Sequence, residues 1–147
     1  MSSNEMKHIH EEQLPVFGYE LIRDFVLPDL LGQEADGILY WAGKNIARKF
    51  PLTSIEEIVT FFEEAGWGQL SIIYEKKDEL LFELSGSIVK RRLEINKENS
   101  FKIEAGFLAQ QIQSQKKAIA ETFEEKLLSK QKVRFTVRWD RKDVTDD

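Results

Sequence analysis

The chain has 147 residues, which is enough for one domain with a single hydrophobic core. Its 21 basic and 26 acidic residues give a net charge of −5, which argues against nucleic acid as the main partner. Cysteine is absent, which excludes disulfides, thiolate nucleophiles and thiolate metal sites. No apolar run approaches the roughly 20 residues that a membrane-spanning helix needs. The first residues lack the apolar segment of a secretory signal, so we expect a cytoplasmic protein without an integral membrane segment.

Residues 1–13 are polar, and we expect them to form a disordered tail ahead of a single domain over residues 14–140. His8 and His10 in this tail could contact one metal ion together. Two histidines make an incomplete site, however, and neither lies in a helix where it could be an axial haem ligand. We therefore predict that the protein has no metal site and no cofactor.

Apolar residues at helical spacing predict two helices in the N-terminal part, at Pro15–Leu31 and Ala35–Lys49. Pro28 should kink or restart the first helix. Gly43 in the second helix marks either the close approach of another helix or ligand, or a tolerated surface position. The two helices are more apolar than one small sheet can cover, so we expect a homodimer formed by their faces. The side chains expected on those faces are Phe17, Leu21, Leu39, Trp41 and Phe50.

A capping-box pattern at Thr53-Ser54-Ile55-Glu56 predicts a third helix, which ends at Gly66. Alternating residues then predict a hairpin over residues 70–84 with its turn at Lys76-Lys77-Asp78. A short basic cluster, Lys90-Arg91-Arg92, follows. It could meet an anionic partner, but the negative net charge favours a solvated face.

The last third of the chain predicts a fourth helix, Phe101–Gln113, and a second hairpin. Residues 118–128 have helix-forming residues, but strict alternation over residues 133–139 provides a strand for them to pair with. We favour the hairpin, with a three-residue loop at 128–130. In that register Phe123 lies opposite Phe135, and Glu121 points toward the core. Residues 141–147 are charged and expected to be disordered.

Three motifs occur in a known order: Gly66-Trp67-Gly68 before a hairpin, a helix with Glu104-Ala105-Gly106-Phe107-Leu108-Ala109, and Glu121 ahead of Val133-Arg134-Phe135-Thr136-Val137. They resemble the ligand-binding fold shared by vinyl-reductase-type domains, haem-based nitric oxide sensors and TRAPP tethering subunits of Golgi transport. From Pro15 to Asp140 the chain is also similar to the YslB family of small bacterial proteins.

The resemblance implies an α+β domain in which an antiparallel sheet of two hairpins, about four strands, is covered by about four helices. It also implies frequent dimers, and ligands held between helices and sheet. Some vinyl-reductase-type domains carry cysteines where this chain has Glu124 and Val133. Their metal or thiol chemistry is therefore not expected here.

No Gly-rich phosphate loop and no Ser-His-Asp set can be assembled, so we predict that the protein is not an enzyme and has no catalytic residues. The expected function is a module that binds a hydrophobic small molecule or a protein partner. The alternatives are a dimerisation protein with a closed core and a carboxylate enzyme that uses Glu121. A ligand pocket between helix and sheet would be lined by Trp67, Phe82, Gly106, Phe107, Glu121, Phe123 and Phe135.

Overall fold

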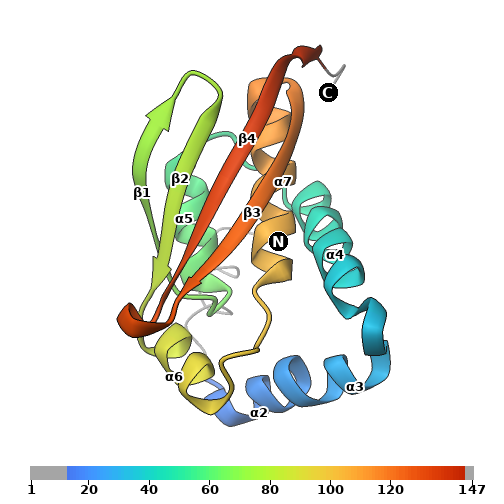
Figure 1. Ribbon diagram of the computed structural model, residues 1–147, viewed down its shortest axis with the longest axis vertical. Helices are drawn as coiled ribbons and strands as arrows, with labels where there is room; N and C mark the ends of the chain where they lie inside the picture. The colour runs from blue at the N-terminus through green and yellow to red at the C-terminus, as the bar shows by residue number, and fades with distance from the viewer. Residues whose placement is uncertain (1–12, 145–147) are drawn as a thin grey trace.

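Two hairpins of alternating apolar residues form one antiparallel sheet with the strand order β1-β2-β4-β3 (Figure 1). The strands are β1 (Gln69–Lys76), β2 (Glu79–Ser85), β3 (Ala118–Leu127) and β4 (Lys132–Val144). The structure is a computed structural model and describes residues 13–144. His8 and His10, with nearly all of the predicted N-terminal tail, lie outside the described residues. At the other end, β4 continues four residues past the predicted domain boundary at Asp140.

The predicted N-terminal helix is one helical run of three parts: α2 (Val16–Glu20), the π-helical η1 (Leu21–Val26) and α3 (Leu27–Leu31). Pro28 lies at the start of α3. Because its ring has no N–H and crowds the carbonyl four residues earlier, the preceding turn widens into a π turn instead of a sharp kink. A short 3-10 turn, η2 (Gly32–Glu34), leads into the predicted second helix, α4 (Ala35–Lys49).

Three further helices complete the fold: α5 (Ile55–Glu64), α6 (Ser87–Ile95) and α7 (Lys102–Lys116). The cap of α5 is one residue later than predicted, because the hydroxyl of Ser54 accepts from the backbone N–H of Glu57. The segment that forms α6 was not expected to contain an element. With this addition, the predicted α+β class with a four-stranded antiparallel sheet is confirmed.

The second hairpin forms as predicted, but its register is one residue away from the prediction. Gln131 adopts a left-handed conformation (φ 54°) and joins the loop after η3 (Leu128–Lys130), so Leu127 pairs with Lys132. A slip of one residue moves every side chain of a strand to the other face. As a result Glu121 and Phe123 are exposed, while Ala120 and Thr122 face the core.

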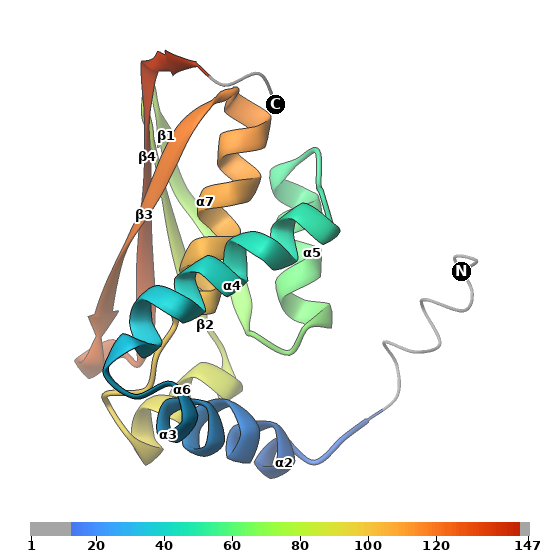
Figure 2. The ribbon, with the colours of Figure 1, turned by 90° about the vertical axis from the view of Figure 1, so that its right-hand side faces the viewer.

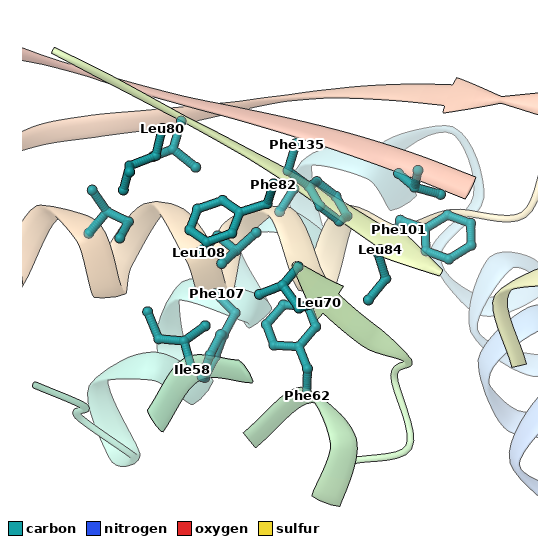
Figure 3. Packing of buried hydrophobic residues seen from close by; sticks show 14 of the residues in the cluster. Ile58, Phe62, Leu70, Leu80, Phe82, Leu84, Phe101, Phe107, Leu108 and Phe135 are labelled. Carbon is teal, nitrogen blue, oxygen red and sulfur yellow. The ribbon is translucent and has the colours of Figure 1, made fainter. Parts of the chain in front are cut away.

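Helix α7 lies in the middle of the protein, between the sheet and helices α4 and α5 (Figure 2). Every residue from Glu104 to Ile112 is therefore buried. In Figure 3, Phe82 and Phe135 of the sheet lie on one side of this helix, and Phe62 of α5 lies on the other. The predicted inward residues of β2, Leu80, Phe82 and Leu84, are all fully buried.

Two glycines allow α4 and α7 to touch through their backbones. A Cβ atom on Gly43 would overlap the carbonyl oxygen of Ile103, and a Cβ on Gly106 would overlap that of Tyr40. The close-approach interpretation of Gly43 is therefore correct, and the neighbour is a helix. Gly106 was expected to face the sheet, but it faces α4.

Candidate interaction site

The N-terminal helix is docked by its charged residues. Glu20 and Arg23 are buried, and the side chain of Asp24 is almost completely covered. These three residues lie within five positions of one another and so share one face of the helix. That face packs against α6, which lies at the same end of the protein (Figure 2), and against the start of α7.

Two arginines of α6 bind the acidic residues of this face. The Arg92 guanidinium donates to both carboxylate oxygens of Asp24, at 2.8 and 2.9 Å. The Nε of Arg91 lies 2.8 Å from both carboxylate oxygens of Glu20. Paired donors and acceptors of this kind fix the orientation of both partners as well as attracting them.

Glu104 in the first turn of α7 is the centre of the group and is fully buried. One of its oxygens accepts from Arg23, and the other lies 3.6 Å from Arg92. Both arginines also donate to the carbonyl of Ser100. Three arginines and three carboxylates thus form one cluster, which we call the ionic cluster (Glu20, Arg23, Asp24, Arg91, Arg92 and Glu104).

The surroundings of the ionic cluster shift two pKa values. Burial raises the pKa of Tyr19, whose hydroxyl accepts a hydrogen bond from Arg23 at 2.9 Å. Burial disfavours the charged form of Arg23, but the charge of Glu104, the neighbouring Tyr19 and the hydrogen bond to Glu104 together outweigh this and raise the pKa of the guanidinium. Both effects keep the arginine charged and the phenol neutral, which is the state that the hydrogen bonds require.

The sequence placed Lys90-Arg91-Arg92 on a solvated face, and for Arg92 this was wrong. The Arg92 side chain is 1% exposed and stacks over the ring of Phe101, 4.3 Å from its centroid. The N-terminal helix did carry a sign of these ion pairs. Glu20, Arg23 and Asp24 lie on the side opposite its apolar residues, and they need charged partners if the side that carries them is buried. The partners are 68 to 81 positions away in the sequence, so no local pattern identifies them.

The other side of the same helix is apolar and exposed. Phe17, Leu21, Ile22, Phe25 and Val26 each expose between 40% and 62% of their surface. A helix on the surface of a soluble protein normally does the reverse, with its apolar side inward and its charges in water. This helix therefore docks through charge and offers its hydrophobic side to the outside.

The structure does not bring the seven predicted pocket residues together. Trp67, Phe82, Phe107 and Phe135 are in the core, while Gly106 is at the crossing with α4. Glu121 and Phe123 are on the outer face of β3, because of the register difference described above. The prediction that Glu121 points toward the core is wrong.

Aromatic rings occupy the space between α5 and α7. Phe107 stacks on Phe61 with 4.5 Å between ring centroids, and Trp67 meets Phe107 edge to face at 5.3 Å. Phe62 meets both Trp67 and Phe107 at 5.0 and 5.8 Å. These are the separations of rings in direct contact, so the rings fill this part of the core.

Glu121 and Phe123 line a shallow surface depression of about 790 Å³ at the outer face of the sheet. Arg138 lies over the ring of Phe123 there, 5.5 Å from its centroid. Within residues 13–140, His, Cys, Asp and Glu do not gather in any group of three that could hold a metal ion. In the described part of the chain, no helix has both the length and the apolar composition needed to cross a membrane.

An antiparallel sheet with helices on one face, including a long buried helix, defines an α+β protein with the vinyl-4-reductase fold. The structure is similar to a vinyl-4-reductase family protein from Methanocaldococcus jannaschii, with a TM-score of 0.68 and 20% sequence identity. The alignment covers 93% of this chain and 89% of that one. At this identity the likeness concerns the fold alone.

Residues 16–138 match the family model described as "Protein of unknown function (DUF2507)", and the chain belongs to this family. It is 52% identical over 136 residues to the uncharacterized protein YslB of Bacillus subtilis (strain 168), covering 92% of both chains. The resemblance to the YslB family and to the vinyl-reductase-type fold is thereby confirmed.

Proposed function

We propose that this protein is a non-catalytic interaction module that forms a homodimer through the outward side of its N-terminal helix. The observation that supports the proposal is the inverted placement of side chains on residues 16–31. Three of its four charged residues, Glu20, Arg23 and Asp24, are covered in the ionic cluster, and apolar residues face outward. Burying charges costs free energy unless they are paired, as they are here. The exposed apolar side is what needs a second surface to cover it.

The amount of apolar surface suits a partner of protein size. Of the seventeen large apolar residues exposed in the described part of the chain, ten lie between Leu14 and Trp41. Together they expose on the order of 1,000 Å², compared with about 800 Å² that each partner contributes to a standard interface. A monomer rarely keeps a contiguous apolar patch beyond a few hundred Å². We call the surface formed by these ten residues the apolar face (Leu14, Val16, Phe17, Leu21, Ile22, Phe25, Val26, Leu30, Ile38 and Trp41).

A second copy of the chain fits the apolar face better than a membrane does. Residues 16–31 contain one arginine, three acidic residues and no lysine. A further acidic residue, Glu34, lies just beyond them. Helices that lie on membranes carry many basic residues on their polar side. Here the polar side is held by the ionic cluster, and a two-fold dimer presents the same patch from both subunits without needing complementary charge.

Of the two kinds of partner expected from the sequence, a ligand between helices and sheet has less support. The ring contacts among Phe61, Phe62, Trp67 and Phe107 favour the closed-core alternative. Gly106 leaves no slot either, because the α4 backbone occupies the space beside it. A hydrophobic small molecule therefore plays no part in the proposed dimer.

Sedimentation velocity across a wide concentration range tests the proposal. We expect the wild-type chain to have twice the monomer mass and Ile22→Glu to have the monomer mass, since a charge would be buried at the interface. Ile119→Glu on β3 is the matched control, because Ile22 and Ile119 are 62% and 56% exposed. It should remain dimeric. A wild-type monomer at every concentration, or a dimer that survives Ile22→Glu, would contradict the proposal.

A further inference from the structure

Four lysines surround a cavity at the end of the protein opposite to the ionic cluster. Lys76 ends β1 and Lys77 lies in the turn between β1 and β2, while Lys116 and Lys117 come from the end of α7. In Figure 1 the turn and the end of α7 both lie at the upper end of the sheet. The cavity has a volume of about 360 Å³, and among the residues whose side chains the structure describes, Glu75 contributes the one carboxylate in its lining.

The local charge is opposite to that of the whole chain. Among the described side chains, four lysines and one glutamate line the cavity, while the protein carries a net charge of −5. Lys116 and Lys117 also complement the negative end of the α7 dipole. The helix dipole does not explain Lys76 and Lys77, which belong to the first hairpin, at the end of β1 and in the turn after it.

The cavity is held in place by contacts around Trp139, which forms part of its wall. Lys116 Nζ lies 3.0 Å from the carboxylate of Glu75 and 5.2 Å from the centre of the Trp139 ring. The backbone N–H of Trp139 donates to the carbonyl of Asp78 at 3.1 Å, which ties the lysine-bearing turn to β4. Groups that are fixed before binding lose less entropy when a ligand arrives.

Lys117 occupies a position that favours glycine. It ends α7 in the left-handed conformation, with φ at 57°. A helix that ends in this way usually carries glycine or asparagine there. Among the described residues neither Lys77 nor Lys117 has an acidic partner within ion-pair distance. Both ammonium groups are thus available to an external anion.

We propose that this cavity binds the phosphate groups of a small phosphorylated compound. Ammonium groups from two separate elements can approach such a group from several directions, and each contact is a charge-assisted hydrogen bond. The apolar ring of Trp139 on one side excludes water and so strengthens the attraction. The same phosphate chemistry occurs in soluble compounds and in lipid headgroups, and the experiment separates these sources.

Calorimetric titration of the full chain with inorganic pyrophosphate tests the proposal. We expect one site per chain, weakened about tenfold or more in the double variant Lys77→Gln, Lys117→Gln, since two charge-assisted contacts are lost. Lys116 is left unchanged because it pairs with Glu75. The control is Lys97→Gln, Lys130→Gln, which removes two exposed lysines at the other end of the protein and should bind like the wild type.

Thermal unfolding of each variant accompanies the titrations. If the double variant melts early, Lys77→Gln alone is titrated. Lys77 lies in the turn between β1 and β2 and, unlike Lys117, does not have a positive φ angle. Absence of pyrophosphate binding by the wild type, or equal binding by both double variants, would overturn the proposal. Binding of a DNA oligonucleotide without binding of pyrophosphate would overturn it as well.

Co-sedimentation with phosphatidylcholine vesicles, with and without phosphatidic acid, then separates the two sources of phosphate. If the protein binds the phosphatidic acid vesicles and pyrophosphate releases it from them, the cavity is assigned to a lipid headgroup. Binding of pyrophosphate without vesicle binding assigns it to a soluble compound.

Discussion

Glu104 should be the most sensitive position of the ionic cluster, and Glu104→Gln tests this with almost no change in shape. The substitution turns a balanced set of three arginines and three carboxylates into one with an unpaired positive charge. Arg23 and Arg92 are 5% and 1% exposed, so water cannot replace the lost carboxylate. One oxygen of the carboxylate would also become an amide N–H₂ group that faces a guanidinium donor.

Removing one partner from a buried ion pair typically costs about 3–5 kcal/mol. We expect Glu104→Gln to lose about this much free energy of unfolding, which corresponds to a fall of roughly 10 °C in melting temperature for a chain of this size. Urea unfolding followed by tryptophan fluorescence measures the loss. All samples need the same protein concentration, because a dimer's apparent stability depends on it.

Glu121→Gln is the matched control, since it makes the same chemical change at an exposed position on β3. An exposed substitution of this kind is expected to change stability by no more than about 0.5 kcal/mol. If the two variants were equally stable, Glu104 would not be the buried partner on which Arg23 and Arg92 depend.

Two further predictions concern the helix crossing and the tyrosines. Gly106→Ala should lose about 1–3 kcal/mol or more in urea unfolding, because its methyl group meets the Tyr40 carbonyl. Gly37→Ala, with open space around it in the same helix as Tyr40, should instead gain up to about 1 kcal/mol; a loss there would contradict this account. The pKa values of all three tyrosines are raised, those of Tyr19 and Tyr40 chiefly by burial and that of Tyr74 by its hydrogen bond to a carboxylate. A raised pKa means that the folded state holds the proton more tightly, so this contribution to stability is complete below pH 10 and declines above it. Ultraviolet titration of tyrosinate should therefore show every tyrosine ionising above pH 10 in the folded protein, and a tyrosine that ionises at its ordinary value before unfolding would refute this.

Local patterns in the sequence were sufficient to predict the long helices and both hairpins, but they missed α6 and did not fix the alignment of the second hairpin. Alternation over residues 133–139 identified a strand, and the hairpin partner followed from it. The register depended on whether Gln131 belongs to the loop or the strand. Only its left-handed backbone decides this, and glutamine gives no sign of that conformation. One dihedral angle thus moved Glu121 from the predicted core to the surface.

The buried face of α4 shows a second limit. A buried face chosen by side-chain size would contain Leu39, Ile46 and Phe50, but the residues that the helix buries are Leu39, Gly43 and Ala47. Small residues are buried here because α7 comes very close. That approach requires Gly106, which is more than sixty positions further along the chain. Long-range pairing of small residues, like that of charges in the ionic cluster, leaves no local pattern in the sequence.

The central position of α7 has a consequence for how the chain folds as it leaves the ribosome. Helices α4 and α5 and the first hairpin are made before α7, yet each packs against it. Strand β2 must also wait for β4, with which it pairs across 49 (Leu84 to Val133) to 59 (Glu79 to Arg138) residues. Structures dominated by such distant contacts fold slowly, and their early parts expose apolar surface meanwhile. The first hundred residues therefore have no core of their own, and the protein should become protease-resistant only once its last strand has emerged.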